Sequence, residues 1–473
     1  MGVQVLGRLQ VQLIGCRVAI FERKHQAGKA GSVQTKIVTM KFHRTPLIIA
    51  LLLLSSLGLS CYAQQGSQTT PFIYGDALPD APELAQRGPH KVGVRTLQLL
   101  HAGQPDIAKA KNGEVPVYDR PLTVEVWYPA VIPAEKAEMT EYEDILGRPN
   151  TEGKPLIPFK FPGRALRDAE PDRSGGVYPL VIVSHGYPGS RYLMTYLTEN
   201  LASKGYVVAA IDHTESTHRD AGPFPSTLYH RPLDILFILD EMARLSEAGS
   251  SSFLSGLADA NNTALIGYSM GGYGVLNVAG AGYSQQLLGF FSQVTGGSTV
   301  IRERTAGAPA MVAAPDNRIK AVVAFAPWGM ARGVWDSLGL AGLRIPTFFV
   351  AGDQDDISGY EDGTRAIYKG SVNTERYLLT YANARHNVAP NPPPPATLVP
   401  GPQQEEFMHY AEPAWSLPRM NNINQHFVTA FLGMKLKGLD YKTYLDLPEQ
   451  ANSAVWKGFK PRTSVGLALE HAE

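Results

Sequence analysis

The residue of this chain with the clearest chemical potential is a serine between two glycines, in Gly267-Tyr268-Ser269-Met270-Gly271. A short apolar run, residues 263–266, precedes it, and small, helix-compatible residues follow. Strand, Gly-x-Ser-x-Gly and helix together predict a sharp turn that lifts the serine hydroxyl above the end of a sheet. The glycines suit such a turn, because a Cβ at either flank would meet neighbouring backbone. We therefore expect Ser269 to be a nucleophile, if a base, an acid and an oxyanion hole accompany it.

The base that this serine needs is expected to be His386. The chain has 12 histidines, and this one comes shortly after the expected strand 376–380. It therefore lies in a loop at the carboxyl end of a late strand, where open α/β sheets place their sites. There it would take the serine proton and return it to the leaving group. The alternative is a loop histidine without a function.

Three carboxylates compete to orient that histidine and to stabilise its protonated form. Asp353, Asp355 and Asp356 all follow the expected strand 347–350. Like charges at this spacing repel, so at most one can face the histidine while the others reach solvent or partners. We assign the role to Asp355, because Gly-x-x-Asp-x-Ile is the usual form of this loop in related folds. Asp353 and Asp356 stay open as alternatives.

Two backbone N–H groups are expected to hold the oxyanion that forms during attack. One is the N–H of Met270, directly after the nucleophile. The other comes from the loop 184–191, whose glycines let backbone approach a ligand closely. Tyr187 is the expected donor there, with Gly186 beside it against the substrate, and we place His185 in this loop rather than as a base. The alternative is an ordinary Gly-Pro turn.

The other histidines that cluster or stand near the last helix are expected to have no part in the chemistry. His213, Glu215 and His218 lie together in a loop, but without the spacing of the helical His-Glu-x-x-His metal motif. We expect a solvated or packing role for them and surface positions for His409 and His426. No metal site and no cofactor are predicted.

Alternating apolar strands and helical stretches are expected to position these groups. The pattern is typical of βαβ units and predicts an α/β fold with a mostly parallel central sheet flanked by helices. Two segments of alternating apolar and polar residues, 92–99 and 122–128, are expected to pair antiparallel at one edge. The other expected strands are 180–183, 206–211, 263–266, 321–325, 347–350 and 376–380, and the expected helices are 191–204, 233–245, 272–279 and 420–435.

Residues 40–63 have the form of a secretory signal peptide. A basic start leads into 13 apolar residues, Leu47–Leu59, too few for a membrane span of roughly 20. We therefore expect an exported protein, periplasmic or secreted, and expect residues 1–39 to precede the true start or to be disordered. Cys61 as a lipidated first residue is the alternative. Cys16 is the other cysteine, so no disulfide is predicted in the mature chain.

The remaining length is expected to form one catalytic domain, residues 89–445. A flexible lead is expected before it at 64–88, and a C-terminal tail after it at 446–473. Three irregular segments are expected within it: a surface excursion at 131–176, a cap or surface loop at 281–316, and a proline-rich pocket wall or spacer at 388–403.

Charge gives no sign of a nucleic-acid partner, because 43 basic and 43 acidic side chains balance. No oligomeric state is predicted.

Several motifs give the chain a family resemblance: Val92–Leu97, Arg120–Pro129, Val183–Gly186, Ala202–Ala210 and the Gly267–Gly271 elbow. With these it resembles the α/β-hydrolase superfamily, and within it the bacterial relatives of platelet-activating-factor acetylhydrolase and of dienelactone-hydrolase-type esterases. Tyr187 and Met270 are also similar to the cutinase and polyester-hydrolase branch. The resemblance covers residues 88–440 and is weakest in the first two irregular segments.

This resemblance implies hydrolysis of a carboxylic ester through an acyl-serine intermediate, without metal or cofactor. The partner that it implies is a small-molecule or lipid ester. Trp328 and Tyr268 would then line the substrate pocket, although aromatic residues at these positions serve equally well in the core. Within enzymes, the alternative is an acyltransferase, a thioesterase or a polyester hydrolase with the same three side chains. Outside enzymes, it is a non-catalytic binding protein of this fold.

Overall fold

The computed structural model describes residues 10–14, 17–21, 72–148, 151–152, 155–313, 315–399, 404–446 and 456–473. The chain forms two units, Met1–Pro71 and Phe72–Glu473. In the first, β1 (Gln10–Ile14) and β2 (Arg17–Phe21) pair antiparallel, within the segment expected to precede the true start or to be disordered. The predicted signal peptide at 40–63 and both cysteines lie outside the described residues.

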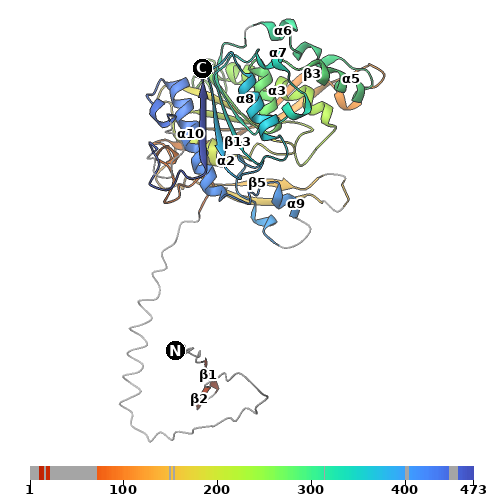
Figure 1. Cartoon of the computed structure of the whole chain (residues 1–473). Coiled ribbons are helices and arrows are strands. Elements are labelled where there is room, and N and C mark those ends of the chain that lie inside the picture. The colour runs from red at the N-terminus through yellow and green to blue at the C-terminus, as the bar shows by residue number, and fades with distance from the viewer. Residues whose placement is uncertain are drawn as a thin grey trace, which may run out of the picture. The chain divides into compact units, whose positions relative to one another are not determined.

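The second unit is built on one large twisted sheet (Figure 1). Its central pairs, from β10 through β9, β11, β12 and β13 to β14, are parallel, and antiparallel pairs flank them at both ends. The predicted antiparallel edge is confirmed by the pairing of β3 with β4. The strands are β3 (Lys91–Pro105), β4 (Val117–Val131), β7 (Leu166–Arg167), β8 (Glu170–Pro171), β9 (Tyr178–Ser184), β10 (Val207–Asp212), β11 (Ala258–Tyr268), β12 (Ile319–Phe325), β13 (Thr347–Gly352), β14 (Arg376–Tyr381) and β15 (Leu467–Ala472).

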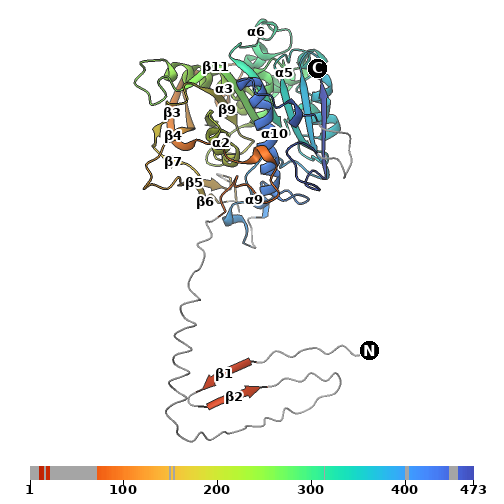
Figure 2. The ribbon, with the colours of Figure 1, turned by 90° about the vertical axis from the view of Figure 1, so that its left-hand side faces the viewer.

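Helices cover both faces of this sheet, which explains why its central strands are apolar throughout. In β9, Val181 and Val183 pack into one core, while Leu180 and Ile182 pack into the other. The first core lies under α2 (Thr195–Ser203) and α10 (Leu417–Lys437), which lie side by side (Figure 2). The second lies under α3 (Phe224–Ser246), α4 (Met270–Val278) and α8 (Arg365–Gly370).

The segments before and after the predicted domain differ from expectation, because both join the folded body. In the described part of the 64–88 lead, Ile73 and Ala85 are buried, and Arg164 Nη2 donates to Asp76 at 2.7 Å. The tail 446–473 contains β15, which pairs antiparallel with β14 and completes the sheet. The residue pattern of a single six-residue strand does not identify the strand with which it pairs when that strand lies far away in the sequence.

The two irregular segments flanking the elbow also contribute to the cores. The 131–176 segment is not a surface excursion: β5 (Thr140–Leu146) and β6 (Ile157–Gly163) form a separate two-stranded sheet that buries Tyr142 and Phe161. The 281–316 segment contains α5 (Gln285–Val294), the short helix η3 (Val300–Arg304) and α6 (Pro309–Val312). It buries Phe291 and Ile301 in the core beneath α3 and α4.

Glu199 on α2 is a buried acid that should make stability depend on pH. It accepts hydrogen bonds from the Tyr142 hydroxyl at 2.6 Å and the Arg164 N–H at 2.9 Å. Burial nevertheless raises its pKa from 4.5 to about 7. An acid with a raised folded-state pKa stabilises the fold fully only below its unfolded pKa, and this contribution is lost as pH rises through the folded pKa.

We therefore expect the unfolding free energy of the wild type, relative to Glu199→Gln, to fall as pH rises from about 4.5 to 7. The fall should be roughly 3 kcal/mol, at about 1.4 kcal/mol for each unit of pKa shift. Urea titrations across this range measure it, and other titrating groups cancel in the difference. Parallel curves for Glu199→Gln would contradict the prediction.

Candidate active site

The elbow around Ser269 connects β11 to α4 without an intervening loop. Ser269 has φ 53° and ψ −113°, a conformation that L-residues rarely adopt and that surrounding contacts must hold. Its N–H donates to the Phe325 carbonyl at 2.9 Å, and its carbonyl accepts from the N–H groups of Tyr273 and Trp328. The strained turn is therefore fixed from β12 and from α4, and it presents the side chain at the carboxyl end of the sheet.

Both elbow glycines are required by close backbone contacts. A Cβ on Gly267 would lie 2.2 Å from the carbonyl oxygen of Gly271. A Cβ on Gly271 would lie 1.9 Å from the carbonyl oxygen of Ser184. Both distances are too short for a side chain, so the pattern Gly-x-Ser-x-Gly follows from the packing of the turn against itself and against β9.

The structure brings Ser269, His386 and Asp355 together in one hydrogen-bonded row. His386 Nε2 lies 3.0 Å from Ser269 Oγ, and Nδ1 lies 3.0 Å from both oxygens of Asp355. An ionised carboxylate only accepts, so the hydrogen of the neutral imidazole belongs on Nδ1 and Nε2 accepts from the serine hydroxyl. This is the arrangement in which a histidine can remove the serine proton.

The neighbouring acids are engaged elsewhere, which separates the three candidates. Asp353 Oδ1 accepts the N–H of Asn383 at 2.7 Å, and Asp356 pairs with the Arg385 guanidinium. Asp355 alone of the three bonds His386, and its side chain is fully buried. Its Oδ1 also accepts the N–H groups of Ile357 and Ser358 at 2.9 Å, which fix the carboxylate in place.

Of the two expected oxyanion donors, Met270 directly follows the serine and Tyr187 belongs to a loop that comes close to it. Met270 is the first residue of α4, so its N–H has no partner within the helix and lies at the positive end of the helix dipole. The loop carrying Tyr187 approaches closely, since a Cβ on Gly186 would lie 3.5 Å from Ser269 Cβ. Within the described part of the chain, neither N–H is hydrogen-bonded to a protein acceptor. Both are therefore available to an oxygen bound beside Ser269.

Comparison with known proteins finds partial matches to one family model and to several cutinases. A family model for platelet-activating factor acetylhydrolase, isoform II, matches residues 164–222. Cutinase est1 of Thermobifida alba is 26% identical over 220 residues, which are 46% of this chain and 56% of that protein. Cutinase 2 of Thermobifida cellulosilytica is 26% identical over 222 residues, 47% of this chain and 64% of that protein. The chain thus spans less than two thirds of the length of either relative.

Among solved structures, a ferulic acid esterase from Streptomyces cinnamoneus is similar, with a TM-score of 0.48 and 21% identity. The similarity covers 76% of this chain and 94% of that one.

The order of the three side chains along the sheet decides the fold class. Ser269 follows β11, Asp355 follows β13 and His386 follows β14, each at the carboxyl end of a parallel strand. The chain has the α/β-hydrolase fold. The fold predicted from the sequence is thereby confirmed, and the family match confirms the resemblance to platelet-activating-factor acetylhydrolases over its residues. The resemblance to dienelactone hydrolases stays a prediction.

Two aromatic residues of the α/β-hydrolase site have different surroundings. Tyr268 is buried, its ring lies 5.3 Å from that of His386, and its hydroxyl donates to Asn387 Oδ1 at 3.1 Å. It therefore supports the histidine. Trp328 is half-buried and packs edge-on against Phe224, which packs in the same way against Tyr187. These three rings form an aromatic wall beside the elbow.

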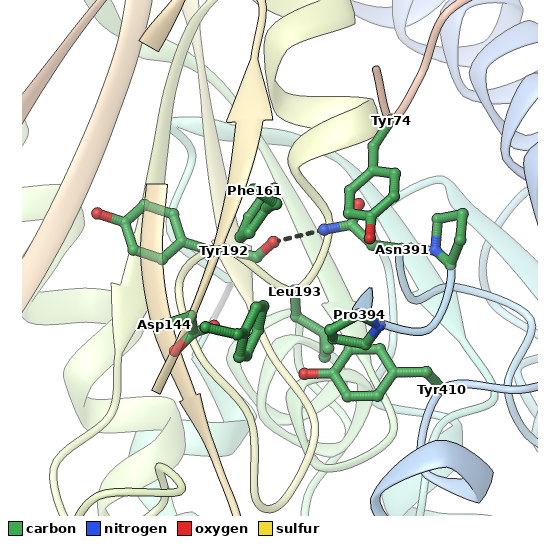
Figure 3. A pocket seen from close by; sticks show the side chains of 10 residues that line it. Tyr74, Asp144, Phe161, Tyr192, Leu193, Asn391, Pro394 and Tyr410 are labelled. Carbon is green, nitrogen blue, oxygen red and sulfur yellow. Dashed lines mark hydrogen bonds between the residues drawn. The ribbon is translucent and has the colours of Figure 1, made fainter. Parts of the chain in front are cut away.

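A small pocket lies between residues that directly follow the 184–191 loop and the proline-rich segment, and Ser269 is not among its lining residues (Figure 3). It holds about 200 Å³ of space free of protein atoms. Asn391 of the proline-rich segment closes one side: its side-chain amide donates to the carbonyl of Tyr192, and its backbone N–H donates to the carbonyl of Leu193. The described part of the proline-rich segment thus holds the residues that directly follow the 184–191 loop. The lining residues are Tyr74, Asp144, Phe159, Phe161, Tyr192, Leu193, Asn391, Pro392, Pro394 and Tyr410.

Of the histidines outside the row, His213 and His218 are buried, in agreement with the packing role, whereas His409 and His426 are more buried than the predicted surface positions. Burial lowers the pKa of His213 and of His426 to about 3. His426 is not at the surface: it lies inside α10 and accepts the N–H of Leu84 at 3.1 Å. His409 is half-buried, with Nε2 2.9 Å from the Pro188 carbonyl. Among the described residues, no group of three or more side chains is placed to hold a metal ion.

His213 belongs to a second Ser–His–Asp row that the sequence did not reveal. Its Nε2 lies 2.9 Å from Ser184 Oγ, and its Nδ1 lies 2.9 Å from Asp234 Oδ2. All three side chains have at most 1% of their surface exposed, so substrate has no access to them. Arg120 holds Asp234 through two hydrogen bonds of 2.8 and 3.0 Å. This second row packs β9 against α3.

Proposed function

We propose that this protein is a serine esterase that cleaves carboxylic esters through an acyl intermediate on Ser269. The observation that carries the proposal is the 3.0 Å separation of Ser269 Oγ from His386 Nε2, with Asp355 on the other ring nitrogen. The cutinases that the chain resembles support the same reaction class. The strained backbone of Ser269 and its partial exposure distinguish this row from a purely packing arrangement and argue against a non-catalytic binding role.

The proposed reaction has two half-reactions, acylation and deacylation, which use the same groups of the site. His386 Nε2 accepts the hydroxyl proton as Ser269 Oγ attacks the ester carbonyl. The N–H groups of Tyr187 and Met270 hold the resulting oxyanion. The protonated histidine then gives its proton to the leaving alcohol. Deacylation repeats these steps with water in place of the serine hydroxyl.

For the substrate, we propose a short acyl group, with a polyester as the second candidate. The half-buried aromatic wall of Tyr187, Phe224 and Trp328 stands beside the elbow, where it would contact the acyl chain or the alcohol. Ser269 and His386 are only 7% and 8% exposed, which favours a small group at the serine. The polyester candidate rests on the cutinase relatives.

A fluorophosphonate probe and p-nitrophenyl esters test the proposal together. We expect stoichiometric labelling of Ser269 and hydrolysis of p-nitrophenyl acetate and butyrate that declines for long acyl chains. Added alcohol should divert little product, which separates an esterase from an acyltransferase. A folded protein that neither takes up the probe nor cleaves these esters would overturn the proposal, and release of soluble fragments from a polyester film would favour the second candidate.

We also propose that the mature protein is exported. The basic residues at Met40–Arg44 followed by the apolar run Leu47–Leu59 support this proposal. Within the residues that the structure describes, no helix has the length and apolar character to cross a membrane.

A further inference from the structure

Two carbonyl oxygens of the 184–191 loop, which carries Tyr187, are held by a buried arginine. Arg231 comes from α3, and its Nη1 donates to the carbonyl of His185. Its Nη2 reaches the carbonyl of Gly186 at 3.4 Å. The ring of His185 also contacts that carbonyl, with Nδ1 at 2.6 Å. Two consecutive carbonyl oxygens of the loop therefore have donors on the interior side.

These contacts determine where the N–H of Tyr187 points. The Gly186 carbonyl and the Tyr187 N–H belong to one peptide group, which is planar and trans. In such a group the C=O and N–H point in opposite directions. Holding the oxygen on the Arg231 side therefore directs the N–H the other way, and the same loop comes close to Ser269 at Gly186.

Arg231 is itself fixed on several sides. Its side chain is 1% exposed, Nη2 donates to Ser216 Oγ at 2.5 Å, and Nη1 reaches Ser184 Oγ at 3.4 Å. Gly274 of α4 leaves room for it, since a Cβ there would lie 2.7 Å from Arg231 Cγ. A guanidinium packed in this way cannot move to another partner without opening the core between α3 and α4.

The charge of Arg231 also acts on the loop. Burial lowers its pKa to about 9, and the negative charge of Asp234 opposes that shift, so the guanidinium stays protonated at neutral pH. Among the described residues, no carboxylate lies within ion-pair distance of it. Its hydrogen bonds go to carbonyl and hydroxyl oxygens. A cation that bonds a carbonyl withdraws electrons from the peptide group and strengthens the N–H of that group as a donor.

We propose that Arg231 is a positioning residue of the oxyanion hole: by holding the carbonyls of His185 and Gly186, it aims and polarises the N–H of Tyr187. The proposal rests on the esterase function proposed above. In this role Arg231 contributes to stabilising the transition state through the loop, although it does not touch the substrate.

The test compares an ester with the matching thionoester, in which sulfur replaces the carbonyl oxygen. Sulfur accepts hydrogen bonds weakly, so the ratio of kcat for the two substrates reports how much the oxyanion donors contribute. We expect Arg231→Met to lower kcat for p-nitrophenyl butyrate about 100-fold, the size of the loss of one oxyanion donor. KM should change little, and the ester-to-thionoester ratio should fall at least about tenfold. Rates are taken per site titrated to completion with a fluorophosphonate, so that unfolded protein does not count.

Arg304→Met is the matched control, since Arg304 is a partly buried arginine that bonds Asn277 and not the loop. It should keep the wild-type ratio. Arg231→Lys keeps a positive charge but not the fork, and should give an intermediate ratio; it decides the matter if Arg231→Met does not fold. A wild-type ratio in folded Arg231→Met or Arg231→Lys would overturn the role of Arg231 alone. Absence of ester hydrolysis by the wild type would overturn the esterase function, and this role with it.

Discussion

Ser269→Ala should reduce ester hydrolysis by about three or more orders of magnitude, because the remaining site has no group to form the acyl intermediate. The change removes one oxygen whose partner is His386 Nε2. The backbone of the elbow is held by main-chain hydrogen bonds that alanine retains. We therefore expect the fold to persist, with a stability change below about 1 kcal/mol. Measuring kcat with p-nitrophenyl butyrate together with thermal unfolding separates the two effects.

Ser371→Ala provides the control for loss of a buried hydroxyl. Ser371 lies directly after α8, is fully buried and donates to the Ile367 carbonyl at 2.7 Å, away from the elbow. That variant should keep wild-type kcat even if it loses some stability. Comparable residual rates for the two variants, or fluorophosphonate labelling that survives Ser269→Ala, would show that another residue is the nucleophile.

Asp355→Asn should lower kcat by about four orders of magnitude. The Asp355 oxygen that faces Ile357 N and Ser358 N must remain an acceptor, so the new amide group of asparagine would face His386. An amide N–H donates to Nδ1, which moves the ring hydrogen to Nε2 and removes the acceptor that Ser269 needs. The loss therefore arises from the wrong tautomer rather than from altered packing, and it should appear in kcat more than in KM.

Asp353→Asn and Asp356→Asn are the matched controls, since they make the same chemical change within three residues. Asp353 bonds the Asn383 N–H and Asp356 pairs with Arg385, so each variant should retain kcat within about threefold. If either of them lost as much activity as Asp355→Asn, the assignment of the acid would be wrong.

The sequence predicted the parts of the site that follow from local pattern. The glycine spacing around Ser269 reports a close backbone contact, and a buried strand ahead of Asp355 or His386 places each at the carboxyl edge of the sheet. The acid needed the structure, because three carboxylates in four residues have the same local pattern. Their separate partners, Asn383, His386 and Arg385, come from a different loop.

What the sequence did not reveal depends on contacts between distant segments. The helix expected at 233–245 begins earlier, at Phe224. The prediction began it too late because a proline usually marks a helix boundary, whereas Pro232 lies inside α3. The missed residues 224–232, about two and a half helical turns, contain Arg231. Strand β15 and the hairpin of β5 and β6 were likewise missed, since pairing partners and burial are set by the tertiary fold rather than by local propensity.

The second Ser–His–Asp row has a consequence for how such sites are recognised. Ser184, His213 and Asp234 repeat the side chains and hydrogen-bond lengths of the proposed catalytic row, to within about a tenth of an ångström. A search that matched only three side chains in space would return both rows as equals. They differ in reach and in surroundings: a reagent can approach Ser269, which has two free N–H groups beside it, while Ser184 is sealed within the core. The identity of the three side chains is therefore not enough to recognise a reactive serine. Solvent access is what distinguishes Ser269, the proposed nucleophile, from Ser184.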